Sequence, residues 1–234
     1  NYTAQRYGSL SQIIEYGADH TLKIKPTVED KKQYSFLKKS YAFKVSRIEP
    51  ENNVHIILEA FADMQRYTLV IVGNWDSNEY GKALKEKYSD FRNIVLLDPI
   101  YNQRKLDVLR SNAMVYVHGH SAGGTNPSLV EAMYLGLPVI AFGVSYNRST
   151  TGHRALYFDT KNDLIQLIEN TSVRTLSDLS VVMKTVSEQR YTWQTIAKKY
   201  DYLVKKAIRT SKKEMVKAQL SKTANSELIN HQVA

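Results

Sequence analysis

Cysteine is missing altogether: none of the 234 residues is a cysteine, which excludes disulfides and thiolate metal sites. Long hydrophobic runs are missing as well, so the sequence predicts no transmembrane helix, and no signal-peptide pattern appears. The phosphate loop G-x-x-x-x-G-K-S/T and the dinucleotide fingerprint G-x-G-x-x-G are absent. We therefore expect a cytoplasmic globular protein whose chemistry depends on other motifs. Because the chain begins with Asn1 rather than methionine, we also expect it to be part of a longer protein.

An excess of positive charge is present. The formal net charge is +9 and the pI is near 9.4, whereas the apolar share of 43% and the charged share of 24% are ordinary. Such a charge suggests an anionic partner, which could be nucleic acid, an acidic membrane face or a phosphorylated small molecule. Seven lysines and arginines lie between residues 205 and 234, and no aromatic stacking motif interleaves them. That pattern argues against nucleic acid.

The basic tail also carries apolar residues at roughly helical spacing, namely Val204, Ile208, Met215 and Leu220. Two interpretations remain open. The tail is either a helix on the anionic inner face of the membrane or a solvated helix that packs on protein.

Apolar runs and helical spacings alternate from residue 41 onward. Short apolar runs predict strands at 41–46, 68–73, 93–98, 113–120, 138–143 and 154–159. Helical spacings fall at 53–64, 80–88, 103–111, 127–136, 161–170, 176–190 and 193–208. The alternation indicates an α/β fold with a doubly wound, Rossmann-like parallel sheet and extra C-terminal helices. The polar stretch before residue 41, with Pro26, predicts a linker.

The loop after the strand at 113–120 resembles an anion site. Gly123 and Gly124 allow a tight turn, Asn126 is a good helix N-cap, and Pro127 suits the first helical position. The following backbone N–H groups, from Ser128 to Val130, are expected to be free to bind an anion. Ligands of such sheets bind at the carboxyl ends of the strands, where this loop is expected to lie.

Charged and polar residues join this loop at the same edge. Glu131 lies about one turn into the helix, where its carboxylate could accept hydrogen bonds from a ribose diol. Arg47 follows the first strand, and its planar guanidinium suits a diphosphate. His118 and His120 could donate hydrogen bonds to a sugar or line the rim. A metal site is not expected, because no cysteine or acid cluster would complete one.

Four ordered stretches resemble the C-terminal half of retaining glycosyltransferases of the GT-B fold, family 4. They are "SRIEPENNVHIILEAF", "TLVIVG", "GGTNPSLVEAMYLGLPVIAF" and "YTWQTIAKKYDYLV". The resemblance covers about residues 41–207. "RIEPENN" and "GGTNPSLVEAM" are more narrowly similar to bacterial polysaccharide rhamnosyltransferases of the kind that build capsules, which use a thymidine-diphosphate-linked rhamnose (dTDP-rhamnose) donor.

The resemblance implies roles for particular residues. Glu131 would bind the ribose, Arg47 and the loop amides from Thr125 to Leu129 would bind the diphosphate, and the base would lie near Asp98 to Ile100. Two family residues are replaced, the first glutamate of the donor motif by Gly123 and a phosphate-binding lysine by Asn52. The expected donor site comprises Arg47, Asn52, Ile100, His118, His120, Gly123, Gly124, Thr125, Asn126, Ser128, Leu129 and Glu131.

The resemblance also implies front-face transfer with retention, without a protein nucleophile, a metal or a cofactor, and it assigns no catalytic residue here. Residues 1–40 would be the end of an N-terminal half plus the linker, 41–190 the nucleotide-sugar domain, and 191–234 the crossover helix and basic tail. The saccharide or lipid-linked saccharide acceptor would bind an absent N-terminal half, so the chain alone should be inactive. The alternatives are a non-catalytic nucleotide-sugar-binding domain and a sugar-nucleotide epimerase of the same fold.

Overall fold

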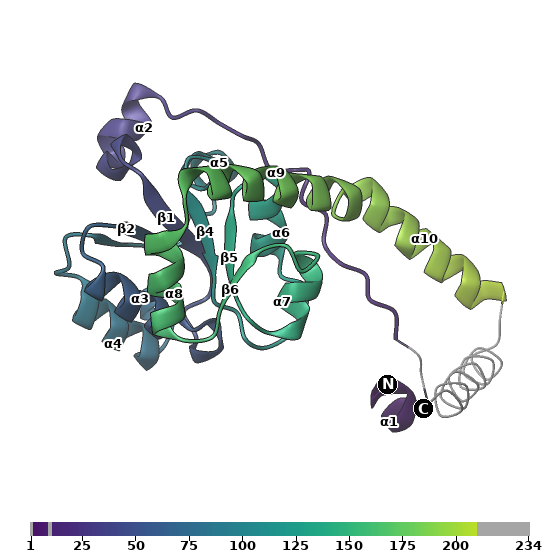
Figure 1. The fold of residues 1–234 in the computed structure, drawn as a ribbon. Helices are drawn as coiled ribbons and strands as arrows, with labels where there is room; N and C mark the ends of the chain where they lie inside the picture. The colour runs from purple at the N-terminus through teal and green to yellow at the C-terminus, as the bar shows by residue number, and fades with distance from the viewer. Residues whose placement is uncertain (1, 9–10, 210–234) are drawn as a thin grey trace. The chain divides into compact units, whose positions relative to one another are not determined.

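The computed structural model describes residues 2–8 and 11–209, which fall into two compact units. The larger unit, Tyr16–Trp193, is a sheet with helices on both faces (Figure 1). The smaller unit combines the chain up to Glu15 with the chain from Gln194 onward. It contains α1 (Tyr2–Tyr7) and most of α10 (Trp193–Arg209).

All six strands of the sheet run parallel, in the order β3-β2-β1-β4-β5-β6. The order reverses direction between β1 and β4, and parallel α/β sheets bind ligands at such a switch point. The predicted doubly wound, Rossmann-like fold is therefore confirmed. The strands are β1 (Tyr41–Val45), β2 (Thr68–Val72), β3 (Ile94–Leu97), β4 (Val115–His118), β5 (Val139–Phe142) and β6 (Leu156–Phe158).

Two apolar cores sandwich the sheet, because successive side chains of a strand point to opposite faces. Phe43 packs in one core and its neighbour Ala42 in the other. The first core is covered by α5 (Gln103–Ser111), α6 (Pro127–Tyr134) and α9 (Val173–Arg190). The second is covered by α3 (Val54–Asp63), α4 (Glu79–Tyr88) and α8 (Lys161–Asn170), which lie on the opposite face in Figure 1.

Several short helices were not predicted. The stretch before residue 41, predicted as a linker, contains α2 (Val28–Gln33) and the 3₁₀ helix η1 (Ser35–Lys38), and α7 (Ser145–Thr150) follows β5. A capping box starts α2: the Thr27 side chain accepts from the Asp30 N–H, and the Asp30 carboxylate accepts from the Thr27 N–H. This reciprocal pair offsets the weak intrinsic stability of a six-residue helix.

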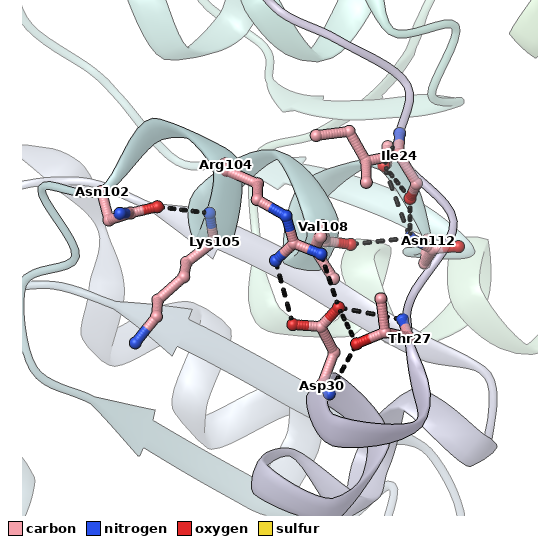
Figure 2. A network of polar contacts seen from close by, with 9 residues as sticks. Ile24, Thr27, Asp30, Asn102, Arg104, Lys105, Val108 and Asn112 are labelled. Carbon is pink, nitrogen blue, oxygen red and sulfur yellow. Dashed lines mark hydrogen bonds and ion pairs between the residues drawn. The ribbon is translucent and has the colours of Figure 1, made fainter.

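Polar contacts tie this stretch to α5, as Figure 2 shows. Arg104 donates to both carboxylate oxygens of Asp30, at 3.2 and 3.1 Å. The Asn112 side chain donates to the Ile24 carbonyl at 2.8 Å and to the Val108 carbonyl at 2.7 Å. These bonds hold the segment from Ile24 to Asp30 against α5.

The smaller unit joins α10 to the residues near Glu15. Lys199 donates to the Glu15 carboxylate at 2.5 Å, and Ile196 is buried. In the part of the chain that the structure describes, no helix is both long and apolar enough to cross a bilayer. Met215, Leu220 and the lysines beyond Arg209, on which the prediction about the basic tail partly depends, lie outside the described residues.

Candidate functional site

A cavity of about 420 Å³ opens at the carboxyl ends of β1, β2 and β3. It is lined by residues 45–49, 72–74, 77 and 99–101, so Arg47 and Ile100, both predicted site residues, line the same cavity. Its volume lies within the range of small-ligand pockets. The 3₁₀ helix η3 (Trp75–Ser77) borders it, held by a hydrogen bond of 3.0 Å from Trp75 Nε1 to the Leu97 carbonyl.

Arg47 reaches this edge as a largely exposed side chain, 72% accessible. It donates to the Glu49 carboxylate at 3.2 Å. The side-chain contact with Glu51 raises the pKa of Glu49, while the hydrogen bond to its own backbone N–H lowers the pKa of Glu51. An ion pair at this exposure is weak, so the guanidinium can turn to a ligand anion at little cost.

The glycine loop packs over His120. Gly123 has φ +112°, a conformation that favours glycine, and a Cβ there would lie 3.2 Å from His120 Nε2. Gly124 has open space around it. His120 Nδ1 lies 2.6 Å from the Asn52 amide oxygen, and the Asn52 amide donates to the Arg47 carbonyl at 2.9 Å. Four of the predicted residues therefore gather at the end of β1, where Asn52 ends the 3₁₀ helix η2 (Pro50–Asn52).

Asn126 caps α6 as predicted, and Pro127 occupies the first helical position. The expectation of free backbone N–H groups after Asn126 was wrong. The Ser128 N–H donates to the Asn126 side chain at 3.0 Å, and those of Leu129 and Val130 donate to the Asn126 carbonyl, each at 3.2 Å. Asn126 thus satisfies the donors itself. Thr125 and the two glycines before it are the loop residues that can still offer N–H groups to an anion.

Both oxygens of the Glu131 carboxylate have partners that the sequence did not reveal. Arg110 Nη1 donates to Oε2 at 2.5 Å, and His20 Nε2 lies 3.0 Å from Oε1. Arg110 is 1% exposed and the Glu131 side chain 15%, so this is a largely buried ion pair. Beside it, burial raises the pKa of Asp107 and the Arg110 charge opposes that rise.

Tyr116 connects the two sides of the switch point. Its hydroxyl lies 2.9 Å from Ser128 Oγ and 3.3 Å from the Val45 carbonyl, so the start of α6 is held against the end of β1. Burial raises the pKa of Tyr116 to about 12. The hydroxyl therefore stays protonated at neutral pH and can donate a hydrogen bond.

Three buried polar atoms without a hydrogen-bond partner lie at this edge, and a fourth lies on α5. Within the described part of the chain they are Ser46 Oγ after β1, His118 Nε2 at the end of β4, Asn147 Oδ1 in α7, and Arg110 Nε beside Glu131. Each such atom costs about 1–3 kcal/mol. Native proteins keep few of them and each calls for an explanation, such as a bound group or a catalytic role.

The two histidines differ in what they can do. His118 is 2% exposed, and burial together with the Lys44 charge lowers its pKa well below the usual range. It is therefore a neutral buried side chain and cannot touch a sugar directly in this arrangement. His120 is half-buried, and its pKa is lowered by burial and by the charges of Lys44 and Arg47. Among residues 2–8 and 11–209, no three histidine or acidic side chains are grouped so that they could hold a metal.

A larger cavity, of about 610 Å³, lies at the opposite edge, around the amino ends of β1, β2 and β4. Arg66 and Arg92 line it, but none of the predicted site residues does. We favour the smaller cavity as the functional site, because parallel sheets bind ligands at the carboxyl ends of their strands. The unpartnered atoms Ser46 Oγ and His118 Nε2 also lie at that edge.

One family model and several solved structures are similar to this chain. The family model described as glycosyl transferases group 1 matches residues 27–172, more than half of the chain. No curated protein sequence matches the chain significantly. Because the matched region runs from α2 to the end of α8, it contains the whole sheet and every predicted site residue.

Solved structures share the fold at low sequence identity. Sucrose-phosphate synthase from Thermosynechococcus elongatus superposes with TM-score 0.71 at 20% identity, covering 89% of this chain and 56% of that one. HepE from Anabaena, solved with UDP and glucose, gives TM-score 0.66 at 16% identity, covering 82% and 55%. The C-terminal domain of LpcC, a group 1 glycosyl transferase of Francisella tularensis, gives 0.57 at 15%, covering 73% and 97%. The chain thus spans little more than half of the first two proteins.

Proposed function

Because this chain belongs to the group 1 glycosyltransferases, we propose that its sheet unit binds the nucleoside-diphosphate sugar from which a sugar is transferred to an acceptor. One observation carries the proposal. A ligand-sized cavity lined by Arg47 and Ile100 opens at the carboxyl ends of β1, β2 and β3, and the buried atoms Ser46 Oγ and His118 Nε2, which lack hydrogen-bond partners, lie at the same edge of the sheet. That HepE was solved with UDP and glucose supports the same ligand class.

Within the site we assign each part of the donor to an element. The base would enter the cavity beside Ile100, the diphosphate would meet Arg47 and the N–H groups of the Gly123 loop, and the ribose diol would bind Glu131. We propose rhamnose as the sugar and dTDP-rhamnose as the donor, on the resemblance of "RIEPENN" and "GGTNPSLVEAM". Gly123 offers no side chain to the sugar, which is compatible with a 6-deoxy sugar that has fewer hydroxyls to recognise.

The acceptor would be a saccharide or a lipid-linked saccharide in polysaccharide synthesis, bound mainly outside the sheet unit. Residues 1–40 would end an N-terminal half and 191–234 would form the crossover helix and tail. If the chain is instead a non-catalytic nucleotide-sugar-binding domain, it would bind the same ligand but would transfer no sugar. An epimerase of the same fold would be expected to bring its own acid–base pairs, and no such pair stands out in the sequence.

Ligand-dependent unfolding tests the ligand class. Thymidine diphosphate and uridine diphosphate should raise the melting temperature, because a ligand that binds only the folded state stabilises it by an amount that grows with the logarithm of its concentration above the Kd. Adenosine diphosphate and inorganic phosphate serve as comparisons. No shift with either pyrimidine nucleotide at millimolar concentration would reject the donor-site assignment.

Arg47 provides a sharper test. Arg47→Ala should weaken binding of the preferred diphosphate about 10- to 100-fold, since a hydrogen bond to a charged group contributes about 1.5–3 kcal/mol. The affinity of Arg47→Lys should lie between those of wild type and Arg47→Ala, because the lysine ammonium keeps the charge but lacks the planar guanidinium that donates two hydrogen bonds. Arg66→Ala is the matched control: the residue is exposed and lines the cavity at the opposite edge. Calorimetry giving equal affinities for wild type and Arg47→Ala would remove Arg47 from the site.

We also propose that the basic tail contacts an anionic membrane, where a lipid-linked acceptor would lie. Each basic residue near such a surface is worth about 1 kcal/mol, and salt screens the attraction. Cosedimentation with phosphatidylglycerol vesicles should therefore fall steeply with added salt and disappear when residues 209–234 are deleted. Binding that is absent at low salt, or that persists after the deletion, would leave packing on protein as the explanation.

A further inference from the structure

The carboxylate of Glu131 is held from two sides by side chains that come from outside its own helix. Arg110 of α5 holds Oε2 from the buried side. His20, whose side chain is 40% exposed, meets Oε1 from the solvent side at 3.0 Å. With both oxygens bound, the plane of the carboxylate cannot rotate freely, although each oxygen keeps a second lone pair for a ligand.

A tryptophan determines which nitrogen of His20 carries the hydrogen. Trp193 Nε1 donates to His20 Nδ1 at 3.3 Å. An indole N–H can only donate, so Nδ1 must be the acceptor and the hydrogen of the neutral ring lies on Nε2. His20 therefore donates to Glu131, and the three side chains form one directed chain of hydrogen bonds. A doubly protonated His20 could not accept from Trp193.

The two ends of the sheet unit meet at this chain of hydrogen bonds. The Trp193 N–H donates to the Asp19 carboxylate at 2.7 Å, and the Ala18 N–H donates to the Tyr191 carbonyl at 2.7 Å. A Cβ on Gly17 would lie 2.4 Å from the Trp193 ring, so only glycine allows the indole this close. Downstream, the Leu22 N–H donates to Asp107 of α5 at 3.1 Å. His20 is therefore fixed between two anchored points.

We propose that His20 and Trp193 are positioning residues for Glu131, and that ribose binding at this carboxylate is transmitted through His20 to Trp193. The inference rests on the proposed function, since it takes Glu131 as the ribose ligand. Residues 17–20 and 191–193 are where the chain enters and leaves the sheet unit. A bound donor would thereby change the contacts of both segments at once.

Two readouts test the proposal. The first is the calorimetric affinity for thymidine diphosphate and uridine diphosphate. His20→Ala should weaken binding about 3- to 10-fold, the effect of one lost hydrogen bond. His20→Gln should restore most of it, because the amide can donate to Glu131 and accept from Trp193. Leu22→Ala is the matched control from the same segment, with a side chain 62% exposed, and should bind like wild type.

The second readout is tryptophan emission, which a merely structural role of His20 would not couple to ligand. The chain has two tryptophans, and Trp75 is buried beside the cavity, so Trp193→Phe reports the Trp75 contribution alone. Saturating nucleotide should change the emission of wild type by more than that of Trp193→Phe. In His20→Ala the nucleotide should change the emission no more than it does in Trp193→Phe. His20→Gln should retain the larger change of wild type.

The outcomes distinguish failure of the proposed function from failure of the inference about His20 and Trp193. If wild type binds neither nucleotide, the proposed function fails and this inference fails with it. If wild type binds, but His20→Ala and His20→Gln keep both the affinity and the Trp193 emission change, only the inference is overturned. Melting temperatures of the variants show whether weaker binding reflects partial unfolding.

Discussion

Glu131→Ala should lower the free energy of unfolding by about 3–5 kcal/mol, because it leaves the Arg110 charge buried without a partner. Arg110 is 1% exposed, and the carboxylate of Glu131 is its ion-pair partner in the described structure. A role of Glu131 in ribose binding alone, as expected from the sequence, would lead only to a loss of donor binding in this variant. Urea unfolding followed by circular dichroism measures the stability effect directly.

Two controls define the origin of that loss. The double variant Arg110→Met, Glu131→Met removes both charges and should be much less destabilised than the sum of its single variants. Glu188→Ala breaks a surface pair with Lys184, in which the side chains are 54% and 36% exposed, and should cost less than about 0.5 kcal/mol. A Glu131→Ala protein as stable as Glu188→Ala would contradict the buried ion pair.

This stability effect changes how Glu131 must be tested as a ribose ligand. Loss of nucleotide binding by the alanine variant could reflect an unfolded site. Glu131→Gln keeps the shape of the side chain and one oxygen that can accept from Arg110. Its binding loss, measured at a temperature where it remains folded, is the relevant quantity. The same structural fact explains why Glu131 is suited to its proposed role, since Arg110 holds the carboxylate before any ligand arrives.

The sheet could be predicted because its strands are short apolar runs separated by helical patterns. β2, for example, is a continuous run that is buried from Leu69 to Val72, which is typical of a central parallel strand. The helices that escaped prediction are short and polar. The sequence signal for α2 was limited to Thr27 and Asp30 at capping-box spacing, and six residues carry too little periodicity to reveal a helix.

The candidate site was predictable where it depends on the ends of strands, and not where it depends on distant contacts. Arg47, Ile100 and Gly123 follow strands, so parallel topology brings them to one edge. His20 meets Glu131 across 111 positions of sequence, and no local pattern indicates such a pair. Asn126 shows a further limit. The sequence identified this residue correctly as the helix cap. It did not reveal that the N–H groups of Ser128, Leu129 and Val130 would all donate to Asn126.

Lys44 should make the stability of the protein depend on pH in the neutral to alkaline range. It lies on β1 opposite Ile71, is 1% exposed, and takes part in no ion pair found among the described residues. Burial lowers the pKa of Lys44 to about 7. In the unfolded chain a lysine has a pKa of about 10.4. Between these values the unfolded state holds a proton that the folded state lacks.

Stability therefore rises with pH from about 7 toward 10, because the unfolded state binds more protons throughout that window. Below pH 7 the folded protein must bury the charged ammonium, so the contribution of Lys44 to the free energy of unfolding is least favourable there. Other buried groups titrate outside the window. Burial raises the pKa of Tyr116 to about 12, and burial lowers the pKa of His118 below its usual value. Comparison with a variant that lacks Lys44 therefore isolates the contribution of this lysine.

Lys44→Met should consequently be more stable than wild type at pH 6.5, by on the order of 3 kcal/mol. The difference should narrow as the pH rises to 9.5, because wild-type Lys44 becomes neutral while methionine does not titrate. Lys39→Met, which removes an exposed lysine just before β1, should change stability little and equally at every pH. Urea unfolding at pH 6.5, 7.5, 8.5 and 9.5 measures all three proteins. If the free energies of unfolding of wild type and Lys44→Met changed in parallel with pH, the lysine would remain charged in the folded protein.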